Sequence, residues 1–112
     1  MRDYCPTDQS ARWAKCWPNK VHTLKTVRPY FQHVQRLAKT FEIRRDDRGF
    51  QPGDLLILAE WDGQFTGQDC AREVTYVLRD GEGFGVKPGY VVLGIREPKS
   101  ATSSDVPPVG AP

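Results

Sequence analysis

A lysine, a glutamate and an arginine stand close together near the middle of the chain, in the stretch AKTFEIRR: Lys39, Glu42 and Arg44. A lysine amine next to a carboxylate and partly screened from water can be a fixed ion pair or an activated amine, because pairing raises the pKa of a lysine and desolvation lowers it. A structural salt bridge is the commoner use of such a pair. The catalytic alternative makes Lys39 a nucleophile or proton shuttle and Glu42 a general base.

Further candidates for ligand binding surround this pair. Glu42 and Arg44 share one strand face by the period of two, and a carboxylate with a guanidinium can hydrogen-bond the edge of a base or hold a phosphate. Lys25, on the preceding strand, is expected to line the same cleft. Phe50 and Trp61 stand at turn or strand ends, where core packing is the default and stacking on a flat ligand is the functional alternative.

The hydrophobic pattern predicts the elements that must position these side chains. Pro29 suits a helix start, and apolar residues then recur at helical spacing, whereas the later segments alternate or are continuously apolar, as in strands. The predicted order is β-α-β-β-β-β, an α+β, mainly β chain that forms a small β-barrel with one or two helices packed beside it. The predicted strands are 21–25, 40–45, 55–61, 70–80 and 90–96, and the predicted helix is 29–38.

The strand TFEIRR alternates apolar and charged residues. We expect Phe41 and Ile43 to fill the barrel interior, and Glu42 and Arg44 to point toward the helix or a cleft beside it.

The two ends of the chain differ from its centre. Residues 1–20 are an extension with a short predicted helix, 11–17, whose Trp13 and Trp17 share a face. We expect this face to pack on the domain, with partner binding as the weaker alternative. Residues 21–97 form the domain, and 98–112 are Pro-, Ser- and Ala-rich and are predicted to be a disordered tail.

Composition narrows the function classes. The net charge of +2 argues against a protein that coats polyanions but allows a local basic patch. The chain has three cysteines with no paired spacing, which argues against a disulfide framework and a structural zinc site. A set of Cys5, Cys16 and His22 is the weaker metal alternative, so we expect no cofactor and no tightly bound metal. With no apolar run of ~20 residues and no signal-peptide core, we expect a cytoplasmic protein that does not enter membranes.

The sequence from His22 to Arg96 resembles the ASCH domains of the PUA-like superfamily. The resemblance rests on the run of motifs from HTLKTVRPYFQ through FEIRRDDRGFQPGDLLIL to FTG, VTYVL and GYVVLGI. It implies a small β-barrel with helices beside it, a cleft between them, and RNA or nucleotide binding. One branch of the family hydrolyses the amide of N4-acetylcytidine, and its Lys-x-x-Thr element followed by Ile-Arg matches Lys39, Ile43 and Arg44 here, while Gly53-Asp54 matches the family's Gly-Asp turn.

The chain departs from that branch at two matched positions. Glu42 stands where the branch has threonine, and Leu37 where it has glycine. The resemblance therefore supports two hypotheses. The first is an amidohydrolase acting on a modified pyrimidine nucleoside such as an N4-acylcytidine, with Lys39 and Glu42 as catalytic residues and Lys25, Arg44, Phe50 and Trp61 around the substrate. The second is a non-catalytic module that binds a modified nucleoside or short RNA in the same cleft.

Overall fold

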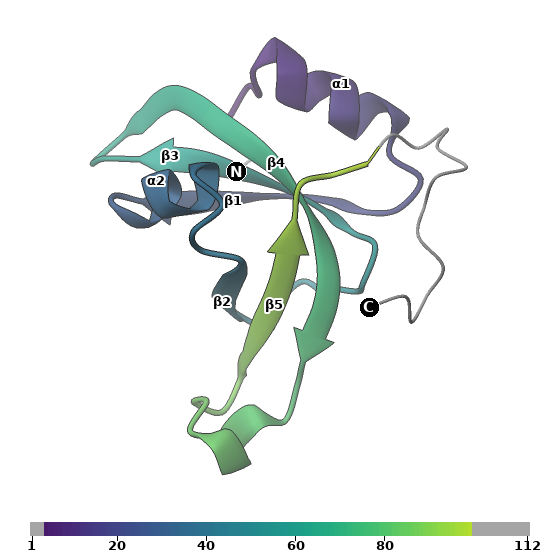
Figure 1. Cartoon of the computed structure of the whole chain (residues 1–112), viewed down its shortest axis with the longest axis vertical. Coiled ribbons are helices and arrows are strands. Elements are labelled where there is room, and N and C mark those ends of the chain that lie inside the picture. Colours follow the sequence, from purple (N-terminus) through teal and green to yellow (C-terminus); the bar gives the residue numbers. More distant parts are fainter. Residues whose placement is uncertain (1–3, 100–112) are drawn as a thin grey trace.

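A computed structural model describes residues 4–99 of the chain. The order of elements along the sequence matches the prediction, including the short helix expected in the N-terminal extension, and within these residues the 3₁₀ turn before the last strand is the one element added (Figure 1). The elements are α1 (Asp8–Cys16), β1 (Val21–Val27), α2 (Tyr30–Gln35), β2 (Phe41–Arg45), β3 (Leu55–Trp61), β4 (Phe65–Leu78), the 3₁₀ turn η1 (Gly81–Phe84) and β5 (Tyr90–Arg96). The predicted tail falls on residues 98–112, of which 100–112 lie outside the described part.

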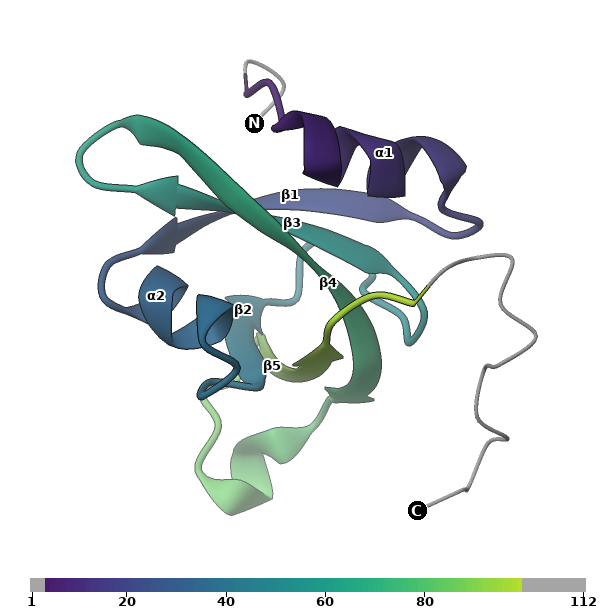
Figure 2. The same cartoon turned by 45° about the horizontal axis from the view of Figure 1, so that its top comes forward.

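All five strands join one curled sheet in the order β1-β3-β4-β5-β2. β1 runs parallel to β3, and every other neighbouring pair is antiparallel. The sheet bends into a half-barrel, which brings its two edge strands, β1 and β2, toward each other beside α2 (Figure 2). The predicted class, a mainly β, small barrel-like domain with helices beside it, is confirmed.

The two faces of the sheet pack against different helices. The concave face holds the main core, and Val34 of α2 is part of it; its other buried members are Leu24, Phe50, Leu56, Leu58, Val74, Val91, Leu93 and Ile95. On the opposite face, Trp13 of α1 and Trp17, the residue directly after the helix, pack against Leu55, Ile57 and Ala71. The expectation that the tryptophan face of the N-terminal helix packs on the domain is therefore confirmed.

The second helix ends earlier than predicted. α2 stops at Gln35, and Leu37 takes the left-handed conformation with φ of 64° that usually falls to glycine. The N–H groups of Ala38 and Lys39 then both donate to the carbonyl oxygen of His33. As a result Lys39 stands on a tight non-helical turn directly before β2, not on the helix.

The prediction that Phe41 and Ile43 fill the barrel interior was wrong. Phe41 and Ile43 are 43% and 55% exposed, whereas Glu42 is 4% exposed and lies opposite buried Leu93 of β5. The period of two correctly paired the residues that share a face, but it does not say which face is buried. An inward carboxylate is acceptable here because cations neutralise it, as the contacts described below show.

The three cysteines are free thiols, and among residues 4–99 no group of three or more Cys, His, Asp or Glu side chains is arranged to hold a metal ion. Cys5 and Cys16 are exposed, and burial raises the pKa of Cys70 to about 11, which keeps that thiol protonated and unreactive at neutral pH. His22, expected as a metal ligand only in the weaker alternative, lies 2.8 Å from Asp54 in the interior. Within residues 4–99, no helix has the length and apolar character needed to cross a membrane.

A second buried carboxylate ties β3 to the segment before α2. The side chain of Glu60 is fully buried, and it accepts hydrogen bonds from Arg28 at 2.7 Å, from Thr66 at 2.7 Å and from Gln32. These bonds, that of Arg28 foremost, lower the pKa of Glu60 to about 2 against the opposing effect of burial. The charged form therefore stabilises the fold.

We predict that Glu60 makes the protein acid-sensitive. Because its folded-state pKa is near 2, below the ordinary value of 4.5, its stabilisation is complete above pH 4.5 and is lost as the pH falls toward 2. The Glu60→Gln variant should be less stable at neutral pH, and its free energy of unfolding should approach that of the wild type near pH 2, as measured by urea unfolding at several pH values. The control Asp62→Asn removes an exposed carboxylate that also contacts Arg28, 3.0 Å away, and should keep the wild-type pH dependence. Parallel pH profiles for wild type and Glu60→Gln would contradict this prediction.

Candidate functional site

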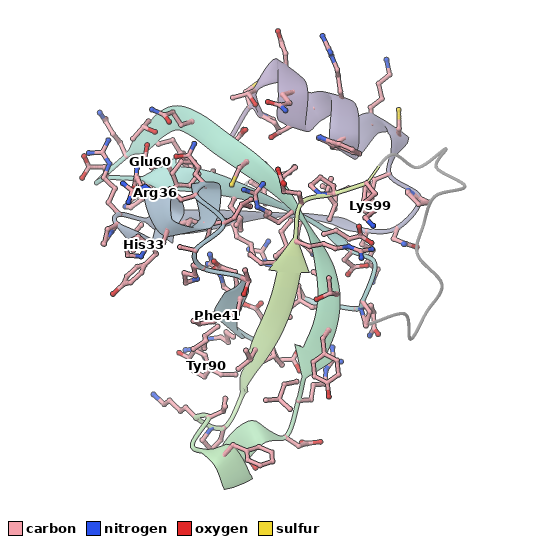
Figure 3. All side chains as sticks on the ribbon, viewed as in Figure 1. His33, Arg36, Phe41, Glu60, Tyr90 and Lys99 are labelled. Atoms are coloured by element: carbon pink, nitrogen blue, oxygen red, sulfur yellow. The ribbon has the colours of Figure 1, made fainter. Side chains whose placement is uncertain are left out.

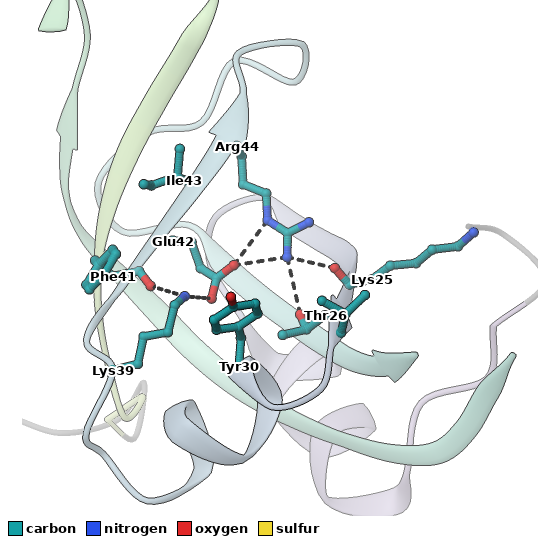
Figure 4. A pocket seen from close by; sticks show the side chains of 9 residues that line it. Lys25, Thr26, Tyr30, Lys39, Phe41, Glu42, Ile43 and Arg44 are labelled. Carbon is teal, nitrogen blue, oxygen red and sulfur yellow. Dashed lines mark hydrogen bonds and ion pairs between the residues drawn. The ribbon is translucent and has the colours of Figure 1, made fainter. Parts of the chain in front are cut away.

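A cleft of about 480 Å³ opens between the two edge strands of the sheet, next to the start of α2 (Figure 4). The local fold produces it: the half-barrel brings β1 and β2 close, but no backbone ladder joins them. The residues that line it are Lys25, Thr26, Val27, Tyr30, Lys39, Phe41, Glu42, Ile43 and Arg44.

Glu42 lies at the centre of a charged network in this cleft. One carboxylate oxygen, Oε2, accepts a hydrogen bond from Lys39 Nζ at 2.7 Å. The other, Oε1, lies 3.1 Å from Arg44 Nε and 3.0 Å from Arg44 Nη2. Two cations thus share one buried carboxylate, and the three charges sum to +1. The cleft is therefore suited to a ligand with electron-rich oxygens.

The guanidinium of Arg44 also joins the two edges of the sheet. Its Nη2 donates to the backbone carbonyl of Lys25 at 2.8 Å and to the hydroxyl of Thr26 at 3.2 Å. Arg48 makes a similar bond, from Nη1 to the carbonyl of Thr23 at 2.9 Å. Arginine side chains thus satisfy carbonyl groups on the free edge of β1 that a neighbouring strand would otherwise bind.

A count of donors and acceptors shows what the network leaves for a ligand. Lys39 Nζ uses two of its three N–H groups, on Glu42 and on the carbonyl of Phe41 at 2.6 Å. Among residues 4–99, Arg44 Nη1 has no hydrogen-bond partner. The side chains of Lys39 and Arg44 are 17% and 22% exposed, so these remaining N–H groups are within reach of solvent. The site offers donors to a carbonyl or an anionic oxygen.

Apolar side chains form the rim of the cleft. Val27 and Tyr30 on one side, and Phe41 and Ile43 on the other, are all between 43% and 55% exposed. Such walls around a few fixed polar groups are typical of sites that bind a small, flat molecule.

The structure brings together three of the six predicted site residues: Lys39, Glu42 and Arg44. Lys25 contributes its backbone to the wall, but its side chain points away from the cleft, and its amine lies 3.8 Å from the ring centre of Trp61 (Figure 4). Trp61 itself packs edge-on against Phe65 and does not line the cleft.

Phe50 cannot stack on a ligand, contrary to the expectation. It is 1% exposed, and its ring lies 4.8 Å from that of His22 in the core. The position of Phe50 after a turn suggested an accessible ring. The strand that follows, β3, is buried on both faces, and Phe50 is buried next to it. Tyr30, the first residue of α2, lies at the rim of the cleft but was not among the predicted site residues, because an aromatic residue at helical spacing is expected to pack in the core.

Comparison with known proteins gives the family but no activity. A family model described as Domain of unknown function (DUF3850) matches residues 21–95, which include every residue of the cleft. A protein of Escherichia phage P2, described as an uncharacterized 12.9 kDa protein in the GpA 3'region, is 41% identical over 59 residues. That match covers 52% of this chain and 54% of the phage protein, so the chain spans about half the length of this relative.

We predict that Arg44 contributes to stability through its shape as well as its charge. Arg44→Lys keeps the charge, but a single amine cannot reach Glu42, the Lys25 carbonyl and the Thr26 hydroxyl together. The free energy of unfolding should fall by about 1–3 kcal/mol, as measured by urea denaturation. Arg45→Lys, at the next and exposed position, is the matched control and should change stability by less than about 0.5 kcal/mol. Equal stabilities for the two variants would show that the contacts of Arg44 with Glu42 and with β1 contribute little to the free energy of unfolding.

Proposed function

This chain belongs to the family described as Domain of unknown function (DUF3850), and we propose that it is an ASCH-like amidohydrolase that acts on a modified pyrimidine nucleoside such as an N4-acylcytidine. The observation that carries the proposal is the 2.7 Å contact between the amine of Lys39 and the carboxylate of Glu42, inside a cleft with apolar walls. A base and a proton donor are thereby fixed side by side where a nucleobase could enter.

Glu42 is the general base in this proposal. Its Oε1 accepts a hydrogen bond from Arg44 Nε and lies 3.0 Å from Arg44 Nη2, and its Oε2 accepts one hydrogen bond from Lys39. Oε2 therefore keeps one acceptor position for a water molecule. Glu42 takes a proton from that water as the oxygen attacks the acyl carbon. The carboxylate can then return the proton through Lys39, which it already contacts.

Lys39 and Arg44 act on the oxygen and nitrogen of the amide. Their remaining N–H groups stabilise the negative charge that develops on the acyl oxygen. Lys39 then protonates N4 as the bond between carbon and nitrogen breaks, which makes it a proton shuttle. One water is consumed, and the products are cytidine and a carboxylic acid. Tyr30 and Phe41, at the rim, would hold the pyrimidine ring.

One observation favours a second candidate function, a module that binds a nucleoside or short RNA without cleaving it. Glu42 lies between two cations, 2.7 Å from the amine of Lys39 and 3.0 Å from the guanidinium of Arg44, so Lys39 is held in an ion pair. A protonated lysine is a good hydrogen-bond donor for a base or phosphate, but it is no nucleophile.

We predict that the purified full chain converts N4-acetylcytidine to cytidine, as followed by chromatography. Lys39→Ala and Glu42→Gln should each lower the rate at least about 100-fold, because each removes a proton-transfer group. Lys15→Ala, an exposed lysine on α1, is the control and should keep the wild-type rate.

The same assay separates the two candidates. Cytidine formation at the same background rate by wild type and Lys39→Ala would overturn the amidohydrolase. Binding of N4-acetylcytidine without turnover, measured by calorimetry and abolished in Lys39→Ala, would support the binding module instead.

A further inference from the structure

The convex face of β2, β5 and β4 carries apolar side chains that lie in rows across the three strands. Phe41, Gly94 and Tyr76 are partners in one row, and Ile43, Val92 and Leu78 are partners in the next. Phe41, Ile43 and Tyr76 are 43%, 55% and 63% exposed, which is unusual for large apolar side chains. We call these six residues the outer platform.

Neither described helix covers the outer platform. α1 packs against Leu55, Ile57 and Ala71, at the other end of the sheet, and α2 packs on the concave side through Phe31 and Val34 (Figure 1). Within residues 4–99, no helix covers this face, so a partner molecule can reach it.

Thr75 covers Gly94 at the centre of the outer platform. β4 has an irregularity there, so that Thr75 and Tyr76 together face Gly94 on β5. A Cβ atom on Gly94 would lie 2.8 Å from Oγ1 of Thr75, so the Thr75 side chain occupies the position that a side chain at residue 94 would take.

Cations stand at one end of this face. Arg45 and Tyr90 (the latter labelled in Figure 3) are partners in the row after Ile43 and Val92. The guanidinium of Arg45 lies 5.6 Å from the centre of the Tyr90 ring, and Lys87 Nζ lies 5.8 Å from the same centre. Within residues 4–99, neither Arg45 nor Lys87 has a carboxylate partner within 4.0 Å. At the opposite end, the carboxylate of Glu73 is neutralised by Arg96 at 3.2 Å.

We infer that the outer platform binds a single strand of nucleic acid. Exposed rings that accept the faces of bases, next to cations that lack a carboxylate partner, form the combination that single-strand binding uses. Phe41 and Tyr76 stack bases, while Arg45 and Lys87 bind phosphates. A second copy of the chain is the other candidate occupant of this face, and the experiment below distinguishes it from a strand.

The platform is continuous with the cleft. Phe41 and Ile43 belong to both, since they stand at the edge strand that separates them. A base at this edge could leave the platform and enter the cleft, so that the substrate would be a modified base within a strand. This last step rests on the proposed function, whereas strand binding does not.

The test is fluorescence anisotropy of the full chain with a labelled oligouridylate about 10 nucleotides long. Tyr76→Ala should weaken binding about fivefold or more, because one stacking partner is lost. The slope of log K against log salt should be about −1.4, from about 0.7 for each of two phosphates, and Arg45→Gln should reduce it by about 0.7. Arg12→Gln, an exposed cation on α1, is the control and should change neither quantity.

Each other outcome overturns the inference. Binding by Tyr76→Ala as tight as that of wild type would exclude the platform, as would no binding at low salt. A dimer in sedimentation that dissociates in Tyr76→Ala, without oligouridylate binding, would assign the face to self-association. Hydrolysis of free N4-acetylcytidine is measured in a separate assay. Tyr76→Ala should still hydrolyse it, and Lys39→Ala should still bind oligouridylate. The amidohydrolase proposal and the strand-binding proposal can therefore fail independently.

Discussion

The buried ion network around Glu42 is the interaction on which the rest of this domain depends. A lone carboxylate at 4% exposure would cost several kcal/mol of desolvation, so it persists only because Lys39 and Arg44 contact it from opposite sides. The same guanidinium reaches the edge of β1. One set of contacts therefore neutralises the interior charge and holds together two strands that share no backbone ladder.

This coupling explains why the cleft exists where it does. A complete backbone ladder between β1 and β2 would fill the space between them and leave no room for a ligand. Arginine side chains span a wider gap than a backbone ladder does. They therefore connect β1 to the segment around β2 and still leave the cleft accessible to a ligand. Any functional role of Lys39, Glu42 and Arg44 is consequently bound to their structural role, and only measurements that separate stability from activity or binding can distinguish the two.

The sequence predicted most of the fold and the centre of the site for definite physical reasons. Strand order along the chain followed from the hydrophobic pattern, and Lys39, Glu42 and Arg44 were placed together by their short spacing. What failed depended on contacts between distant segments. The orientation of β2 depends on the cations that contact Glu42. The end of α2 is set by Leu37, which adopts a left-handed conformation that a sequence usually signals with glycine. Phe50 was assigned by its turn, but the burial of the next strand determines its environment.

The orientation of β2 has a second consequence on the other side of the sheet. Because successive side chains of a strand point to opposite faces, turning Glu42 inward necessarily turns Phe41 and Ile43 outward. A strand chosen only for stability would place polar residues on that solvent-facing side, as most half-exposed strands do. The large apolar residues there lie beside a glycine and opposite Tyr76, outside the main core. The proposed binding of a nucleic-acid strand would give these outward residues a role that the core does not, since the neighbouring cations favour a negatively charged partner.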